Sequence, residues 1–183
     1  MIINMYKKSD ELNCKPPDLI TRPVGRVMYK SVRTMIDSAM DGETILFDFN
    51  GIRVIDSSFI DETIVKLIVD SVQMPKIFFI KLKNISEITE INIDMVFKSY
   101  WGYKNKKIVV ITENICHNNA FFIGPLSDTE KDIVEFLRVN KFATLNDIMK
   151  FSGVTMEHGA RIMDELYSMR VIKKGKDGIY RAV

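Results

Sequence analysis

The chain has 183 residues, of which 46% are hydrophobic and 27% charged, and its 26 basic and 24 acidic side chains give a formal net charge of +2. This composition is typical of a globular protein. The chain lacks the strong overall positive charge that marks many nucleic-acid-binding proteins. Cys14 and Cys116 lie far apart and outside any CxxC pair, which favours free thiols over a disulfide or a metal site. No signal-peptide pattern and no run of about 20 apolar residues is present, so we expect a cytoplasmic protein that does not enter a membrane.

The N-terminal residues predict a strand, a loop and a helix in that order. Residues 1–5 predict an edge strand, and the polar residues 7–18, which include two prolines, predict a loop. A helix is expected to begin near Pro23, because a proline loses no hydrogen bond in the first helical turn. Five apolar side chains then share one face of this helix: Met28, Val32, Met35, Ile36 and Ala39.

A basic stripe occupies another face of the same helix, formed by Arg26, Lys30 and Arg33 at spacings of four and three residues. The simplest interpretation is a solvated helix face. The alternative is a docking surface for an acidic protein partner.

The rest of the chain is organised around residues 43–72. Residues 44–50 are apolar and bounded by Asp-Gly and Asn-Gly pairs, which predicts a buried strand. Apolar residues at helical spacing follow from position 60 to position 68, so a helix is expected there. Between them lies the turn Asp56-Ser57-Ser58, where the start of the helix leaves backbone N–H groups for a side-chain oxygen or an anion. This junction is the first candidate functional site.

Three segments carry a resemblance to a known family. The sequences LFDFNGI at 46–52 and IDSSFIDE at 55–62 resemble the STAS-like domain of unknown function found in bacterial proteins, and LITRPVG at 19–25 resembles the entry to its first helix. More distantly, the turn resembles that of the STAS domain of anti-sigma factor antagonists, where Asp-Ser-Ser-Gly opens a helix after a central strand. The resemblance covers roughly residues 17–112 and implies a mixed sheet with helices packed on it.

Strands and helices continue to alternate up to residue 124, which argues for a βαβ sheet and an α/β (or α+β) domain over residues 1–124. In the helix, Ile88, Ile91 and Met95 are expected to face inward. The predicted elements are strands at 76–82 and 107–112, a helix at 86–100 and an edge strand at 120–125.

Residues 125–183 have a different pattern and form a second predicted domain. Ser127 and Glu130 fit a capping box, in which each side chain bonds the other's backbone N–H. The predicted elements are helices from 127 to about 140, 144–148 and 155–169, and strands at 171–174 and 179–182. Three helices followed by a β-hairpin resemble a winged helix-turn-helix domain.

The winged-helix resemblance implies that the third helix and the hairpin contact duplex DNA. The helix face offers one positive and two negative charges, whereas the hairpin clusters several cations that suit phosphates. The candidate contacts are Thr155, Met156, Glu157, His158, Arg161, Lys173, Lys174, Lys176 and Arg181. Duplex DNA binding, as a possible homodimer, is the leading interpretation. A protein-binding or dimerisation module is the alternative.

Ser57 matches the serine that is the phosphorylated switch in anti-sigma factor antagonists. A phosphate there would meet helix N–H groups but would be repelled by Asp56, Asp61 and Glu62. The sequence also departs from the antagonist pattern, because Phe59 replaces the glycine and the following Leu-Gly is missing. The simpler interpretation is that Ser57 or Ser58 caps the helix.

Enzymatic chemistry is not expected. His117 and His158 have no metal-ligand partner at a suitable spacing, and no Gly-rich phosphate loop occurs. Cys116 and His117 are adjacent, but the sequence supplies no separate base and orienting group for nucleophilic catalysis. We therefore expect a non-enzymatic regulator without cofactor or metal, in which a STAS-like domain binds a protein partner, or senses a signal through one, and a winged helix binds DNA. The alternative is an adaptor that acts only through protein contacts.

Overall fold

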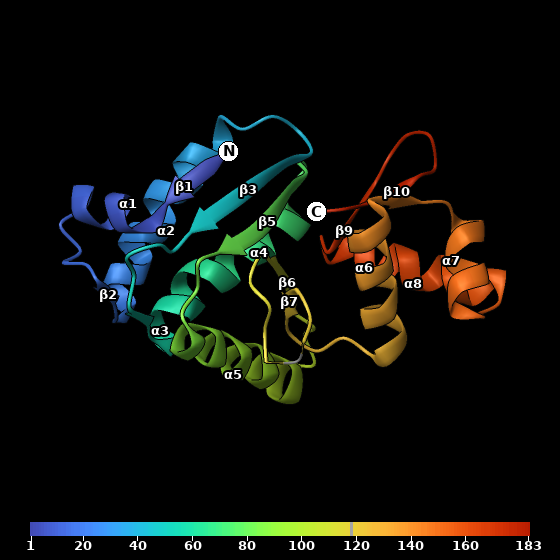
Figure 1. Ribbon diagram of the computed structural model, residues 1–183. Helices are drawn as coiled ribbons and strands as arrows, with labels where there is room; N and C mark the ends of the chain where they lie inside the picture. Colours follow the sequence, from blue (N-terminus) through green and yellow to red (C-terminus); the bar gives the residue numbers. More distant parts are fainter. Residues whose placement is uncertain (118) are drawn as a thin grey trace. The chain divides into compact units, whose positions relative to one another are not determined.

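The computed structural model describes residues 1–117 and 119–183 (Figure 1). The chain divides into two compact units, Met1–Pro125 and Leu126–Val183. Across the described residues, no helix has both the length and the apolar character needed to cross a bilayer.

A five-stranded sheet of order β1-β3-β5-β6-β7 forms the centre of the first unit. Its strands are β1 (Ile2–Asn4), β3 (Glu43–Asp48), β5 (Phe78–Lys83), β6 (Val110–Thr112) and β7 (Phe122–Ile123). The first four are parallel, and β7 closes the sheet antiparallel to β6. The predicted mixed sheet is confirmed, including the edge positions of its first and last strands.

Helices pack on this sheet and on one another, and a small parallel pair of strands precedes the central helix. The helices are α1 (Met5–Glu11), α2 (Arg22–Asp37), α3 (Ser57–Ile60), the π-helical turn η1 (Asp61–Val65), α4 (Lys66–Gln73) and α5 (Glu87–Lys104), and the strand pair is β2 (Asp18–Leu19) with β4 (Val54–Ile55). Thus α3, η1 and α4 form one continuous helix with a π-bulge. Such bulges are frequent at functional sites.

The predicted loop over residues 7–18 is wrong in its first part, because α1 occupies it. The Asn4 side chain accepts the Lys7 N–H at 2.8 Å and so caps this helix. Only Met5 and Ser9 are buried on α1, so the helix has too few apolar positions to produce a helical pattern in the sequence.

The core of the first unit lies between the sheet and helices α2 to α5. Met28, Val32 and Ile36 of α2 are completely buried, as expected from their spacing. Aromatic rings fill much of the space between the layers. The largest fully buried side chains include Phe47, Phe49, Phe59, Phe78 and Phe97.

Helix α5 is oriented differently from the sequence prediction. Ile88, Ile91 and Met95, expected to face inward, are 53%, 43% and 64% exposed. The buried positions are Thr89, Ile93, Val96 and Phe97. Apolar residues occupy both faces of α5, so spacing alone does not identify the face that meets the core. The helix also continues past Trp101 to Lys104, so that Gly102 lies inside it.

The second unit has the element order helix, strand, helix, helix, strand, strand. Its elements are α6 (Asp128–Asn140), β8 (Phe142–Ala143), α7 (Leu145–Ser152), α8 (Met156–Ser168), β9 (Ile172–Lys174) and β10 (Tyr180–Ala182). The predicted capping box of Ser127 and Glu130 is present. The strands form an antiparallel sheet of order β8-β10-β9, of which only the two-residue β8 was not predicted.

Candidate functional site at the start of helix α3

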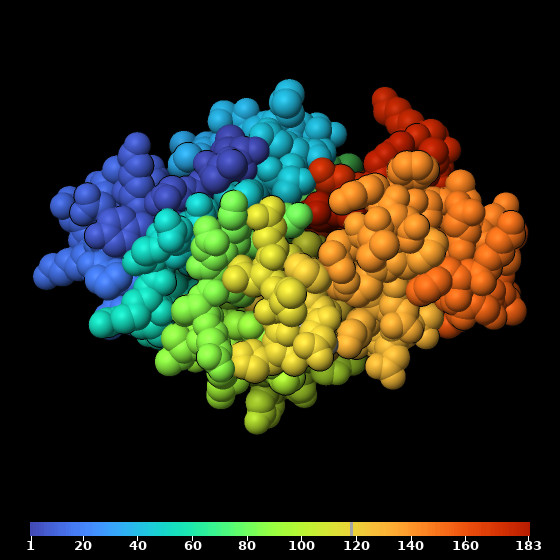
Figure 2. Space-filling model, viewed as in Figure 1, coloured from blue at the N-terminus to red at the C-terminus, as the bar shows by residue number. Residues whose placement is uncertain are grey.

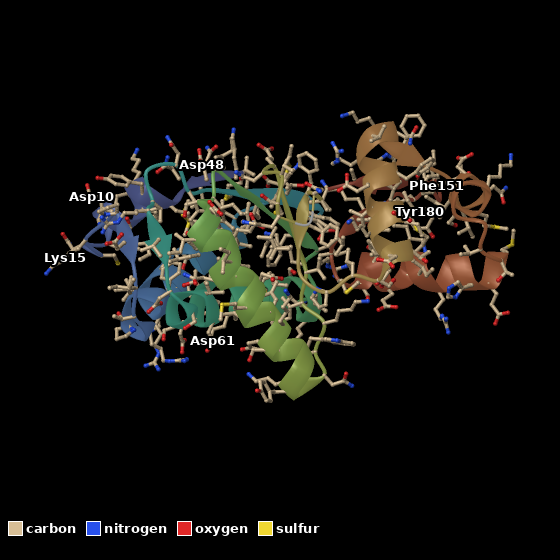
Figure 3. All side chains as sticks on the ribbon, turned by 60° about the horizontal axis from the view of Figure 1, so that its bottom comes forward. Asp10, Lys15, Asp48, Asp61, Phe151 and Tyr180 are labelled. Atoms are coloured by element: carbon tan, nitrogen blue, oxygen red, sulfur yellow. The ribbon has the colours of Figure 1, made fainter. Side chains whose placement is uncertain are left out.

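An open pocket of about 360 Å³ lies where the start of α3 meets α5. The predicted residues Ser57 and Ser58 line it, as does Asp61, whose side chain is labelled in Figure 3. The residues that line it come from four elements: Arg22 of α2; Ser57 and Ser58 of α3; Asp61 of η1; and Met95, Val96, Ser99, Tyr100 and Lys104 of α5.

The start of α3 is capped by Asp56, so the prediction that Ser57 or Ser58 caps this helix is wrong. One carboxylate oxygen of Asp56 accepts the Phe59 N–H at 2.7 Å, and the other accepts the Thr21 N–H at 3.0 Å. Ser57 is therefore the first helical residue and lies exposed at the pocket. Because Asp56 bonds two segments, it also fixes the entry of α2 against α3.

Asp56→Ala is expected to lower the free energy of unfolding by about 1–2 kcal/mol, because it removes a helix cap and leaves two N–H groups without their acceptor. The matched control Ser57→Ala is expected to change it by less than about 0.5 kcal/mol, since an exposed hydroxyl is lost. Urea unfolding followed by circular dichroism measures both. An equal loss in the two variants would show that the serine is the cap.

Arg22 connects the pocket to the π-bulge. Its Nη1 donates to Asp61 Oδ2 at 2.9 Å and to Glu62 Oε1 at 2.7 Å. The Tyr100 hydroxyl donates to the second oxygen of Asp61 at 2.5 Å. Burial, together with this bond to Asp61, raises the pKa of Tyr100 to about 12. The phenol therefore remains a donor at neutral pH and ties α5 to η1.

Glu62 is the most enclosed charge at the site, with 5% of its side chain exposed. It bonds Lys66 and Arg22, and Arg26 Nε lies 3.5 Å from its Oε1. The hydrogen bonds from Lys66 and Arg22 outweigh burial and lower the pKa of Glu62 to about 2. Three cations thus neutralise this carboxylate, so the repulsion expected between Glu62 and a phosphate on Ser57 is largely cancelled.

The lowered pKa of Glu62 predicts how stability varies with acid. The ionised Glu62 carboxylate contributes fully to the free energy of unfolding above its unfolded-state pKa near 4.5. This contribution is lost as the pH falls towards the folded-state pKa of about 2. Glu62→Gln is expected to destabilise the chain at neutral pH and to flatten the pH dependence of the urea midpoint between pH 4.5 and 2. The exposed Glu11→Gln serves as the control. An unchanged acid profile in Glu62→Gln would contradict the assignment.

Gly25 lets α2 approach the π-bulge closely. Thr63 Oγ1 donates to the Gly25 carbonyl at 2.9 Å, and a Cβ on Gly25 would lie 2.8 Å from the Cβ of Glu62. Only glycine permits this approach. Sequence reasoning did not identify Gly25, although a glycine inside an amphipathic helix is the signal that points to such a contact.

The predicted basic stripe on α2 is largely paired within its own unit. Arg26 contacts Glu62, and Arg33 bonds Asp37 and approaches Asp70 at 3.3 Å. Lys30 is exposed. Two of its three side chains, Arg26 and Arg33, thus link α2 to the helix that contains η1 and α4.

The candidate DNA contacts of the second unit lie on α8 and the β9–β10 hairpin. Thr155 caps α8, and four of the predicted residues on its first turns are exposed: Met156, Glu157, His158 and Arg161. Lys174 on β9 pairs with Asp164 on α8 at 3.1 Å, which holds the hairpin beside the helix.

The other predicted hairpin cations have different surroundings. Arg181 pairs with Asp177 at 2.6 Å within the hairpin. Lys176 is exposed in the turn, and Lys173 lies opposite Arg181 in the strand register. At least two of the four cations, Lys174 and Arg181, therefore already have acidic partners.

His117 has partners that the sequence did not reveal. Its Nδ1 lies 3.0 Å from Glu90 and its Nε2 3.2 Å from Glu87, residues 27 and 30 positions away. The neighbouring Cys116 is buried, and burial and Glu90 raise the pKa of its thiol to about 12. This thiol is protonated at neutral pH and is a poor nucleophile. Within the described residues, no cluster of three or more His, Cys, Asp or Glu side chains is arranged to hold a metal ion.

Comparison with protein families places a STAS-like domain of unknown function at residues 30–92. The match runs from α2 into α5 and includes Asp56, Ser57 and the π-bulge, whereas Arg22 and Tyr100 lie outside it. The mixed sheet of the first unit fits a STAS-like fold. No curated protein matches the chain. The STAS-like match points to a regulatory or protein-interaction role.

Proposed function

We propose that the chain is a two-part regulator, in which the STAS-like first unit binds a protein partner and the second unit binds duplex DNA as a winged helix. The order of elements in residues 126–183 supports the second half of this proposal. In winged and other helix-turn-helix domains, a recognition helix enters the major groove and flanking elements hold the backbone. In this proposal α8 is the recognition helix, and the β9–β10 hairpin is the flanking element that holds the DNA backbone.

The observation that carries the DNA proposal is the joint placement of α8 and the hairpin by the Lys174–Asp164 pair. It joins the end of β9, next to the cation-bearing turn, to the second half of α8, on the helix face that also carries the exposed Glu157 and Arg161. Surface ion pairs contribute only about 0–1 kcal/mol, so a phosphate can replace Asp164 or Asp177 as the partner of a cation. The carboxylates nonetheless weaken the attraction, and we expect modest affinity with a clear salt dependence.

Fluorescence anisotropy of a labelled 25-base-pair duplex, titrated with the full chain at several salt concentrations, tests the DNA proposal. The dissociation constant is expected to rise steeply with salt. Lys173→Glu combined with Lys176→Glu should abolish binding, while Lys7→Glu with Lys15→Glu, an equal charge change at exposed positions of the first unit, should not. Absence of binding at low salt, or binding that salt does not weaken, would remove the proposal.

A second candidate function is an adaptor switched by phosphorylation of Ser57. The exposed Ser57 shares its pocket with Arg22 and Lys104, while Asp61 and Glu62 are already paired. Phe59, which stands where antagonists have glycine, is fully buried and does not obstruct the surface. A phosphate would therefore alter a docking surface that includes two cations. Mass spectrometry of protein purified from its native host tests this, and an unmodified Ser57 in every growth state would exclude it.

A further inference from the structure

One face of α5 carries an apolar stripe that its own unit leaves exposed. We define the outer stripe as Ile88, Ile91, Met95, Ser99 and Gly102, which follow one another at spacings of three and four residues. Its three large side chains are between 43% and 64% exposed. Helix α5 lies on the outside of the first unit, and its side chains form part of the surface (Figure 1 and Figure 2). Spacings of three and four are those of helices that pack along a shared seam.

The side chains of the outer stripe become smaller along the helix. Its first half carries large side chains, and its second half carries Ser99 and Gly102. A glycine inside a helix costs stability and usually marks a close approach. Yet a Cβ on Gly102 would meet no atom of the described chain within 4 Å, apart from the neighbouring helix backbone. The first unit itself therefore gives no reason for glycine at this position.

We infer that α5 packs against α5 of a second copy of this chain, antiparallel, about a two-fold axis near Met95. In this arrangement Ile88 lies opposite Gly102 of the other copy, and Ile91 lies opposite Ser99. The large half of each stripe thus faces the small half of the other, and Met95 meets its own counterpart. A two-fold interface requires such self-complementarity.

The charges beside the stripe fit the same arrangement. Asp94 and Lys98 lie on one flank of the stripe and pair with each other at 2.6 Å. In an antiparallel pair this flank meets the same flank of the other copy, so each Asp94 comes close to the opposite Lys98. A parallel pair would instead bring the two glycines together and place this flank of the two copies on opposite sides of the seam, so that Asp94 would not reach the other copy's Lys98. The exposed face of α5 is therefore complementary to itself in both size and charge. This self-complementarity favours a second copy of the chain over a different protein.

The proposed interface also borders the Ser57 pocket, because Met95 and Ser99 line that pocket as well as the stripe. A second copy on α5 would form an additional wall beside Ser57. The inference itself depends on neither DNA binding nor phosphorylation.

Light scattering of the full chain during gel filtration, at about 100 µM, tests the dimer. The wild-type mass is expected at twice the 21.1 kDa of one chain, and Ile91→Glu is expected to return it to 21.1 kDa. Val72→Glu is the matched control, since Val72 is a helical residue with the same exposure, 44% against 43%. A monomeric wild type, or a dimer that survives Ile91→Glu, overturns the inference, whatever other protein the surface binds.

Charge exchange and cross-linking test the antiparallel geometry. Asp94→Lys should weaken the dimer at least tenfold, and adding Lys98→Asp should restore it. Met95→Cys should form a disulfide-linked dimer, whereas wild type, with Cys116 buried and Cys14 partly buried, should not. Ile88→Cys should cross-link to Gly102→Cys chains but not to itself, because the two Ile88 positions would lie about 21 Å apart along the axis, beyond the ~7 Å limit of a disulfide. Self-linked Ile88→Cys would refute the antiparallel pairing.

Discussion

Gly25→Val is expected to lower the free energy of unfolding of the first unit by about 2–3 kcal/mol, the cost of forcing extra carbon atoms into a packed interface. The Cβ alone would lie 2.8 Å from the Cβ of Glu62 and 3.2 Å from the Cα of Phe59. Neither atom is the end of a flexible side chain, so α2 must move away from η1. That movement would also separate Arg22 from Asp61 and Glu62.

Urea unfolding, followed by circular dichroism, measures the Gly25→Val effect. Lys30→Val is the control, because Lys30 is exposed on the same helix and valine there costs only its lower helix propensity, under about 1 kcal/mol. Equal losses in the two variants would mean that Gly25 is not a packing position. A loss confined to Gly25→Val would establish that the π-bulge is held by the close approach of α2.

The order of elements followed from the sequence because each long element has a strong local signal. The buried face of α2 repeats at helical spacing, and the capping box of Ser127 and Glu130 marks the start of α6. Helix α1 and strand β8 lacked such signals. Helix α1 buries only two residues, and β8 has only two residues in all, so neither produces a measurable period.

The position of the candidate site could be predicted from the sequence, but the hydrogen bonds that connect its residues could not. Asp, Ser and Ser are all good helix caps, so composition does not choose among them. The choice is made by β4, which pairs with β2 as far as Ile55 and leaves Asp56 as the first residue outside the strand. Arg22 and Tyr100 reach Asp61 across 39 residues in either direction, and no local pattern predicts such contacts.

The sequence also did not predict which face of α5 is exposed. Ile88 and Ile91 follow the helical period as well as Ile93 and Phe97 do, and only packing against the sheet determines which pair is buried. A helix that is apolar on two faces requires two neighbours. Its own unit supplies one, and the proposed second copy would supply the other.

Asp164→Asn combined with Asp177→Asn is expected to tighten duplex binding roughly tenfold at 50 mM salt. The two carboxylates lie 3.1 and 2.6 Å from Lys174 and Arg181. Their removal frees two cations for phosphates and deletes two negative charges from the same surface, each worth about 0.5–1 kcal/mol. The Ile179 N–H donates to Asp177 Oδ1 at 3.0 Å, and the amide oxygen introduced by Asp177→Asn can still accept that bond, so the turn should persist.

The salt dependence of this gain distinguishes DNA contact from a general charge effect. The advantage of the double variant should shrink as salt rises, because the freed cations act through screened interactions. Asp10→Asn with Glu11→Gln makes the same net charge change on α1 and should leave affinity nearly unchanged. An equal gain in this control, or no gain in the double variant, would mean that the hairpin does not face the duplex. The second unit would then be better described as a docking module.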